Sequence, residues 1–341
     1  MEPLNFSMIT TTTKAWSDNS TAPPNPTDWE DQLTLARNIV PPYMFILCAL
    51  GLLGNSFVLL VFLAQKDRLT IPEIYLGNLA LADIVLLVVL PFWAMTIRHH
   101  FVWHYGEAMC KIMYSSINVN FYTSIYIIAM VSVDRYLALV QTMRARWLRR
   151  TMYAKVICVV MWLWGFFMST PNLVYGTLNY ASVNGTLICV MDYGPTQRLA
   201  HIAFSVLGFA LPVVVIVFCS GAVIRALNRR RTVCSDQGSD RKPTTLVFAV
   251  TTLFLVCWAP HHVFNFLDVL RKLAIVKAPW GPALFIVHKV AMYMVFLNSV
   301  LNPVLYVFFG KYFWKKVSAL FRKPKHHHHG DVIGVYSHAP S

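Results

Sequence analysis

Charged residues are scarce in this chain, and the scarcity argues against a soluble globular protein. Only 13% of the 341 residues are Asp, Glu, Lys or Arg, about half the share that soluble domains carry. Acidic residues are fewer than basic ones, at 15 against 29. Hydrophobic residues make up 57% of the chain, and the mean hydropathy is +0.53. This composition indicates a protein that crosses a membrane several times.

Motifs of several other protein classes are missing as well. The chain has no zinc-finger spacing, no basic-aromatic RNA signature and no phosphate-cradling glycine loop, so its net charge of +14 does not indicate nucleic-acid binding. No internal repeat is visible, which argues against most transporter folds. No cluster of catalytic residues favours an enzyme, and no metal-ligand motif favours a metal site. The first forty residues lack the apolar core of a signal peptide, so we expect the first apolar segment to act as the insertion signal.

Seven apolar segments are each long enough to cross a membrane. A span needs about 20 apolar residues, and its backbone must satisfy its own hydrogen bonds as a helix. The sequence therefore predicts an all-α membrane protein, a seven-transmembrane helix bundle over residues 39–308, preceded by a polar segment, 1–38, that we expect to be disordered and glycosylated. The expected spans are residues 39–64, 72–97, 109–140, 153–171, 199–224, 244–268 and 283–308.

Lysine and arginine are sorted between the two sets of connections. The connections after the first, third and fifth spans, together with the C-terminal tail, hold most of them. Because cytoplasmic loops carry the excess of positive charge, we expect the N-terminus outside and the C-terminus inside. The glycosylation sequons at Asn5, Asn19 and Asn184 all fall on the predicted outside.

The cysteines sort in the same way. Four lie within spans, where a thiol is usually a small apolar side chain, and a fifth lies in a cytoplasmic, reducing loop: Cys48, Cys158, Cys219, Cys257 and Cys234. The remaining two, Cys110 and Cys189, are the ones expected in an oxidising compartment. They form the one plausible disulfide.

One carboxylate is expected deep in the membrane. Asp83 lies in the middle of the second span, so it must face the bundle and find polar partners. One carboxylate ringed by neutral oxygen donors suits a small monovalent cation. The alternative is a water-filled hydrogen-bond network with no ion. Candidate partners are Asn55, Asn120, Ser124, Asn298, Ser299 and Asn302.

The triplet Asp134-Arg135-Tyr136 closes the third span. Charges at a membrane boundary are costly and seldom incidental. Arg135 has two candidate acidic partners, its neighbour Asp134 and Asp240 at the start of span six, and breaking such a pair would let span six move outward. The alternative is a solvated surface pair worth under about 1 kcal/mol. Further along, Trp258 beside the helix-kinking Pro260 is a plausible two-position lever.

These features occur in a characteristic order and spacing. The motifs are Gly54-Asn55, Leu79-Ala-Leu-Ala-Asp83, Cys110, Asp134-Arg135-Tyr136, Trp162, Pro212, Cys257-Trp258-Ala-Pro260 and Asn302-Pro303-Val-Leu-Tyr306. Together they resemble those of the rhodopsin-like (class A) G-protein-coupled receptors, over roughly residues 38–322. One departure is Ser220, where most of that family carries a tyrosine that helps to hold the active state.

The resemblance implies roles for several of these residues. It implies a Cys110–Cys189 disulfide, a toggle at Trp258 and coupling to a heterotrimeric G protein through Arg135. The activation switch it implies consists of Asp134, Arg135, Tyr136, Asp240, Trp258, Asn302, Pro303 and Tyr306. It also implies a sodium ion as an allosteric modulator, held by Asp83, Asn120, Ser124, Asn298 and Ser299, and no other cofactor.

The resemblance extends past the seventh span. It implies a short amphipathic eighth helix over residues 309–322, lying on the inner leaflet of the membrane lipid. The cytoplasmic tail, 323–341, has few phosphorylatable residues, so we expect only weak recruitment of receptor kinases and arrestin through it. The tail run His326–His329 could bind a metal, but such a run is more often incidental.

Further segments narrow the ligand class. Ile117 stands where amine receptors carry an aspartate, and Phe296 stands where opsins carry the retinal lysine. The chain more closely resembles the kinin (bradykinin) receptors, especially the type-2 subtype, which implies a bradykinin-like peptide ligand and signalling through Gq-family proteins to phospholipase C and calcium. The alternative is a receptor for another peptide, angiotensin-like or chemokine-like. The matching segments are Glu73-Ile-Tyr-Leu-Gly-Asn78, Leu90-Pro-Phe-Trp-Ala94, Phe101-Val-Trp103-His-Tyr-Gly106-Glu107, Ser132-to-Val140 and Phe266-Leu267-Asp268.

In kinin receptors, acids near the outer ends of spans six and seven receive the basic end of the peptide. Asp268 matches the first acid, but the second is absent, and Pro282 stands near its expected place. A lost charge-assisted contact of this kind costs about 1.5–3 kcal/mol. Asp192 and the acidic stretch from Asp28 to Asp31 are candidates to compensate. The expected ligand-binding residues are Asp268, Asn265, His261, His262, Asn118, Trp93, Trp258 and Tyr293. For His261 and His262, the alternative to a polar pocket role is pH sensing or metal binding.

Overall fold

The computed structural model describes residues 26–65, 68–141, 150–180, 185–233, 241–272, 275, 282–309 and 311–321. The helices in these ranges are α2 (Pro26–Leu63), α3 (Ile71–Arg98), α4 (Gly106–Leu139), α5 (Thr151–Tyr175), α6 (Pro195–Val233), α7 (Arg241–Lys272), α8 (Pro282–Phe309) and α9 (Lys311–Phe321). Within the described ranges, seven helices, α2 to α8, are long and apolar enough to cross a membrane. The predicted seven-helix bundle with a short eighth helix is confirmed.

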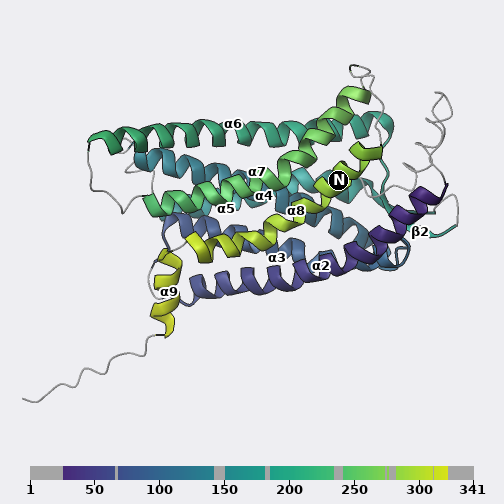
Figure 1. Cartoon of the computed structure of the whole chain (residues 1–341), viewed down its shortest axis with the longest axis horizontal. Helices are drawn as coiled ribbons and strands as arrows, with labels where there is room; N and C mark the ends of the chain where they lie inside the picture. Colours follow the sequence, from purple (N-terminus) through teal and green to yellow (C-terminus); the bar gives the residue numbers. More distant parts are fainter. Residues whose placement is uncertain are drawn as a thin grey trace, which may run out of the picture.

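The helices α2 to α8 run roughly along the long axis of the molecule, and α9 lies across one end of the bundle (Figure 1). The third membrane helix, α4, is central, because 78% of its most apolar window is buried, against 22% for α5 and for α6. The exposed faces of α5 and α6 are rich in Leu, Val and Phe, as expected where helices face lipid. The helix α7, which contains Pro260, bends part-way along its length (Figure 1).

Two short strands, which the sequence analysis does not predict, lie between α5 and α6. β1 (Gly176–Tyr180) and β2 (Leu187–Met191) form an antiparallel hairpin in which Leu178 pairs with Cys189. The backbone N–H of Trp103, in the α3–α4 connection, donates to the carbonyl of Leu187 at 2.8 Å. The hairpin therefore lies at the end of the bundle opposite α9 (Figure 1), and we call this end the hairpin end.

The first membrane helix begins earlier than the sequence analysis expects. The candidate span starts at Arg37, close to the predicted residue 39, but α2 continues outward to Pro26. Proline at the start of a helix and acids in its first turns both favour an N-terminus. Asp28 and Glu30 follow Pro26 here. Composition alone does not register this local signal, so the disordered segment was expected to reach residue 38.

Close approaches between helices occur where small residues lie. A Cβ added to Gly165 on α5 would lie 2.4 Å from Thr123 Oγ1 on α4. One added to Gly54 on α2 would lie 3.0 Å from the Pro303 ring on α8. Membrane helices associate through such small residues because they let two backbones come together. The second of these contacts holds α2 against α8, where Asn55 Nδ2 donates to the carbonyl of Ser299 at 2.8 Å.

Candidate functional site

The buried carboxylate of Asp83 joins three helices. Asp83 on α3 is fully buried. Its Oδ1 accepts hydrogen bonds from Asn120 Nδ2 on α4 at 3.1 Å and from Ser299 Oγ on α8 at 2.7 Å. Its Oδ2 accepts one from Asn302 Nδ2 on α8 at 2.9 Å. Two residues of the predicted sodium set, together with one predicted switch residue, therefore meet at a single carboxylate.

The remaining candidates around Asp83 are buried but are placed differently. Asn55 Nδ2 donates to the carbonyls of Gly51 at 2.9 Å and Ser299 at 2.8 Å, so it ties α2 to α8 instead of contacting the carboxylate. Ser124 and Asn298 are buried. Within the described part of the chain, the Ser124 hydroxyl and the Asn298 amide have no hydrogen-bond partner. The amide oxygens of Asn120 and Asn302 also have no hydrogen-bond partner among the described residues.

This donor set fits a hard cation. Buried polar atoms are normally hydrogen-bonded, and here several neutral oxygens without partners lie on the helices around one carboxylate. Hard cations are held by carboxylate, amide and hydroxyl oxygens rather than by nitrogen or sulfur. Asp83, Asn120, Ser124 and Asn298 are therefore the residues that could hold a small monovalent cation.

The charged triplet lies at the end of α4 away from the hairpin. Arg135 Nη2 and Nε approach Asp134 Oδ2 at 2.5 Å and 3.2 Å. The two side chains are only 13% and 7% exposed, so this is not the solvated surface pair that the sequence left open. The other candidate partner, Asp240, lies outside the described residues. Tyr136 places its ring 6.0 Å from that of Phe218 on α6.

The other predicted switch residues lie in the core. The Trp258 side chain is 2% exposed, and its ring lies 4.5 Å from that of Phe121 on α4 and 5.8 Å from that of Phe254 on its own helix. Tyr306 is buried, and its hydroxyl has no hydrogen-bond partner among the described residues. Pro303 is buried and packs against Gly54 on α2. These residues pack inside the bundle, so a change in their arrangement would require helices to repack.

The predicted ligand-binding residues separate into two groups. His261 and His262 on α7 are both 3% exposed. His261 Nε2 pairs with Asn265 Nδ2 at 3.0 Å. The His262 ring stacks 4.2 Å from the ring of Phe209 and 4.7 Å from that of Phe121, so it belongs to the same aromatic group as Trp258.

The second group is nearer the hairpin end. Trp93 and Tyr293 pack in the apolar cluster that also contains Cys110 and Cys189. Asn118 is partly exposed on α4, two turns past Cys110. Asp268 lies on α7, but its side chain is outside the described part of the structure. The predicted set therefore surrounds the hairpin half of the bundle rather than forming one tight cluster.

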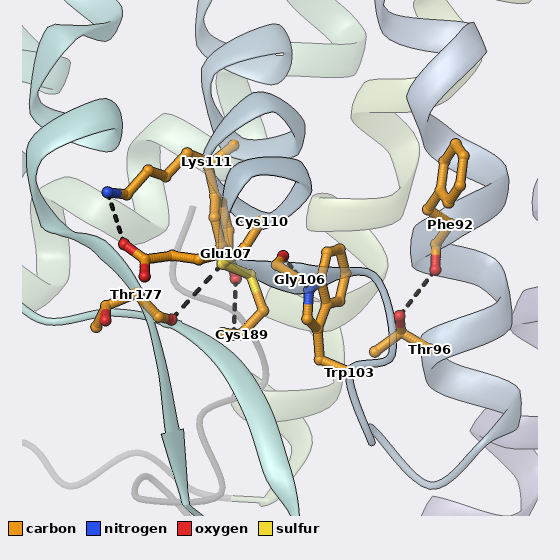
Figure 2. The surroundings of a disulfide bond; sticks show 10 residues. Phe92, Thr96, Trp103, Gly106, Glu107, Cys110, Lys111, Thr177 and Cys189 are labelled. Carbon is orange, nitrogen blue, oxygen red and sulfur yellow. Dashed lines mark hydrogen bonds and ion pairs between the residues drawn. A yellow bond between two sulfur atoms is a disulfide. The ribbon is translucent and has the colours of Figure 1, made fainter.

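The expected disulfide is present. Cys110 at the start of α4 is bonded to Cys189 in β2, with their Cα atoms 5.7 Å apart (Figure 2). Beside it, the Trp103 indole N–H donates to the carbonyl of Gly106 at 2.8 Å. The disulfide and the indole together anchor the hairpin and the α3–α4 connection to α4.

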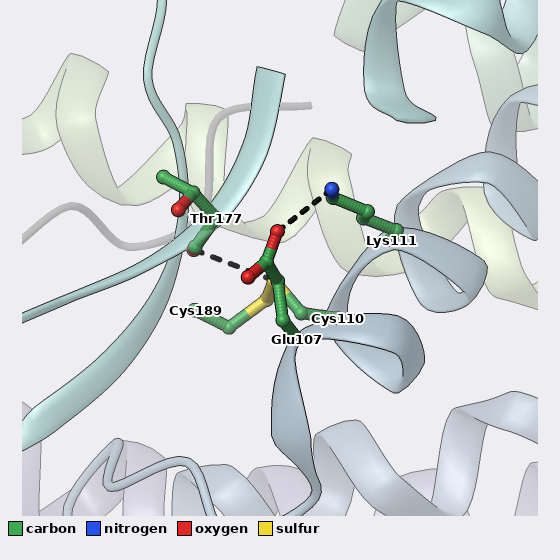
Figure 3. A network of polar contacts seen from close by, with 5 residues as sticks. All are labelled: Glu107, Cys110, Lys111, Thr177 and Cys189. Carbon is green, nitrogen blue, oxygen red and sulfur yellow. Dashed lines mark hydrogen bonds and ion pairs between the residues drawn. A yellow bond between two sulfur atoms is a disulfide. The ribbon is translucent and has the colours of Figure 1, made fainter. Parts of the chain in front are cut away.

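An ion pair on the same turn of α4 is more exposed. Figure 3 shows Glu107 turned towards Lys111, with Nζ and Oε1 2.7 Å apart. Cys110 Sγ lies 3.6 Å from the carbonyl oxygen of Thr177 in β1. The side chains of Lys111 and Glu107 are 30% and 52% exposed. Such a solvated pair contributes little to stability.

The structure adds residues that the sequence reasoning missed. Tyr193, between β2 and α6, donates its hydroxyl to Asn172 Oδ1 at 3.3 Å, and Asn172 Nδ2 donates to the carbonyl of Tyr114 at 3.0 Å. Burial raises the pKa of the Tyr193 hydroxyl. No local sequence signal marks this network, because it joins residues from α4, α5 and a loop.

A second missed feature did carry a signal. Thr70 and Glu73 form a capping box at the start of α3, in which Thr70 N donates to Glu73 Oε2 at 2.7 Å. The Thr-x-x-Glu spacing of such a box is visible in the sequence. Lys316 on α9 forms an ion pair with the same carboxylate.

The sequons at Asn5, Asn19 and Asn184 and the run His326–His329 lie outside the described residues. In the part of the chain that the structure describes, no three His, Cys, Asp or Glu side chains are grouped so that they could hold a metal ion. His261 and His262 lie in the described part of the chain and belong to no such group.

The fold and these contacts define a class of protein. The model of the seven-transmembrane receptor family (rhodopsin family) matches residues 54–306. The chain therefore belongs to this family of signalling receptors, as the motifs predicted, and it is a multi-pass protein of the plasma membrane.

Individual relatives narrow the comparison. The B2 bradykinin receptor of Oryctolagus cuniculus is 39% identical over 303 residues, which cover 87% of this chain and 82% of the relative. The B2 bradykinin receptor of Homo sapiens is 38% identical over 286 residues, covering 82% and 73%. The B1 bradykinin receptor of Macaca mulatta is 35% identical over 313 residues, covering 89% and 88%. The predicted resemblance to kinin receptors is confirmed.

Proposed function

We propose that this chain is a receptor for a kinin-like peptide and that it signals through a heterotrimeric G protein, of the Gq family, to phospholipase C and calcium. The observation that carries the proposal is the 35–39% identity to bradykinin receptors over more than four fifths of the chain. The largely buried Asp134–Arg135 pair and the polar junction at Asp83 support a bundle that switches between arrangements.

The proposed orientation puts the hairpin end outside the cell. The excess of lysine and arginine in the connections at the opposite end supports it. A disulfide between Cys110 and Cys189 also suits an oxidising compartment. In this orientation the Asp134–Arg135 pair faces the cytoplasm and the G protein.

The proposed mechanism is a population shift. A ligand favours activation only if it binds the active arrangement of helices better than the inactive one. The peptide's C-terminal end would lie deep, near Trp258, Asn118 and Tyr293, and its basic end near Asp268. Because Trp258 packs directly on Phe121, a ligand that displaces α7 relative to α4 must repack this contact, and α7 is also the helix that would move at the cytoplasmic end.

We also propose that Asp83 and the oxygens around it hold a sodium ion that modulates the receptor. The support is the complete burial of Asp83 together with the unpartnered oxygens of Ser124, Asn298 and Asn120. The ion would supply a positive charge that compensates the buried carboxylate. The alternative of a water-filled network predicts no preference for sodium over potassium.

The ligand assignment is tested by calcium release in cells that express the chain. Bradykinin and related kinins should give a response, whereas angiotensin-like and chemokine-like peptides should not. Changing Asp268 to Asn should lower kinin potency about 10- to 150-fold, the equivalent of one charge-assisted contact of about 1.5–3 kcal/mol. Glu107→Gln serves as the matched control, since it removes a half-exposed acid from the same end of the bundle. A response only to peptides outside the kinin set, unchanged by Asp268→Asn, would overturn the assignment.

A further inference from the structure

The short helix α9 has few means of remaining folded by itself. It contains 11 residues, and isolated helices of this length are marginal in water. Phe313 and Val317 are buried against the bundle, whereas Trp314 and Leu320 are 50% and 40% exposed. The position of α9 across the end of the bundle (Figure 1) therefore depends on what holds its inner face.

Two of the contacts that hold α9 involve its first turn and do not use charge. The Phe313 ring lies edge-on to the rings of Phe57 at 5.9 Å and Phe62 at 6.1 Å, both on α2. The Trp314 indole N–H donates to the carbonyl of Val307 at 2.9 Å, in the last turns of α8. Because such carbonyls lack helical partners at a helix end, the indole caps α8 while it orients α9.

The third contact is an ion pair that reaches a different helix. Lys316 Nζ pairs with Glu73 Oε1 in the first turn of α3, and the two side chains are 17% and 10% exposed. The other carboxylate oxygen, Glu73 Oε2, accepts the backbone N–H of Thr70. One largely buried carboxylate is thus divided between capping α3 and holding α9. A buried carboxylate that loses its partner keeps its desolvation cost, so the two contacts are not independent.

We infer that Glu73 is a positioning residue: through Lys316 it couples the start of α3 to α9 and so sets where α9 lies at the end of the bundle that carries Asp134 and Arg135. The consequence for G-protein activation rests on the proposed function. The geometric coupling does not, since it follows from contacts within the chain alone.

The test is hydrogen–deuterium exchange of the purified receptor without ligand. Nanodiscs of phosphatidylcholine alone are used, so that no anionic headgroup can replace Glu73 as the partner of Lys316. Glu73→Gln breaks the ion pair but keeps an acceptor for Thr70, because capping boxes accept Gln. Lys316→Met breaks the same pair from the other side. Either change should speed exchange of the amides of residues 313–321 about tenfold, in line with the loss of one charged hydrogen bond.

The controls separate coupling from general destabilisation. Lys316→Arg keeps the charge and should keep the wild-type exchange. Glu107→Gln removes one partner of the exposed pair at the hairpin end and should leave α9 unchanged. In the double variant Glu73→Gln/Lys316→Met, the amides of α9 should exchange no faster than in either single variant, because both changes remove the same interaction.

Three results would overturn the inference. They are unchanged exchange in α9 for Glu73→Gln, faster exchange spread equally over all helices, and additive effects in the double variant. Agonist-stimulated nucleotide exchange on the G protein is measured in the same nanodiscs and should fall at least threefold with unchanged peptide affinity. If the wild-type receptor gives no kinin response, the proposed function fails while the exchange result still stands.

Discussion

Replacing Asp83 with Asn tests the buried junction most directly, because the side chain keeps its shape and loses its charge. If the amide oxygen takes the place of Oδ1, the bonds from Asn120 and Ser299 at 3.1 Å and 2.7 Å are retained. The amide nitrogen then takes the place of Oδ2, which in the wild type lies 2.9 Å from Asn302 Nδ2. Two hydrogen-bond donors would therefore face each other. One charge-assisted hydrogen bond of about 1.5–3 kcal/mol is lost.

The removal of a buried charge, by contrast, raises the stability of the variant. An ion transferred from water into a protein interior costs several kcal/mol even after relaxation, and the variant avoids that cost. We therefore expect Asp83→Asn to be about as stable as the wild type, or more stable, in a buffer without sodium. A marked loss of stability in that buffer would contradict this balance.

The response to sodium separates the two interpretations of the site. An ion that binds the folded state at ten times its Kd stabilises it by about 1.4 kcal/mol. Thermal unfolding of the purified receptor is compared in sodium chloride and in potassium chloride of equal ionic strength. The wild type should unfold at a higher temperature in sodium, and Asp83→Asn should show no difference, while Glu107→Gln should behave as the wild type. If Asp83→Asn keeps the full sodium response, the ion does not bind at Asp83; if the wild type shows none, the water network is favoured.

Three further predictions concern other parts of the bundle. Cys110→Ala should lower the free energy of unfolding by about 4.5 kcal/mol, because the disulfide closes a loop between residues 79 positions apart; the check is the amount of receptor at the cell surface, which should fall. Gly165→Ala should lower the unfolding temperature, since the added Cβ would lie 2.4 Å from a hydroxyl oxygen on α4, whereas Gly77→Ala, with its nearest atom at 3.5 Å, should raise it. Asp134→Asn should raise basal signalling by releasing Arg135 from its 2.5 Å partner; equal basal activity at equal surface expression would count against the switch.

The Asp83 junction shows how far sequence reasoning reached into the site. The position of Asp83 within an apolar span predicted that it must find polar partners, and Ser299, Asn302 and Asn55 were among the candidates. The structure gives a contact to Asn302 and to Ser299, and it directs Asn55 to backbone carbonyls instead. Which of several candidates meets the carboxylate depends on how each helix is rotated about its axis, and no spacing rule within one helix gives that.

The ligand-binding residues show the same limit. The sequence treated His262 and Trp93 as one set, but His262 packs in the aromatic group around Trp258, and Trp93 packs beside the disulfide. The β1–β2 hairpin was not predicted either. Its strands are only five residues long, and their pairing is a contact between separate segments.

The sequence by itself determined the number and approximate ends of the membrane helices, the pairing of Cys110 with Cys189 and the receptor family. The physical reason is that a bilayer imposes its thickness and polarity on each segment separately, so the run of apolar residues is enough to identify a span. Only the tertiary structure decided that Glu73 meets Lys316, that Asn302 meets Asp83 and that the Asp134–Arg135 pair is largely buried. Those contacts depend on crossing angles and helix rotations, which are set by the packing of all the helices together.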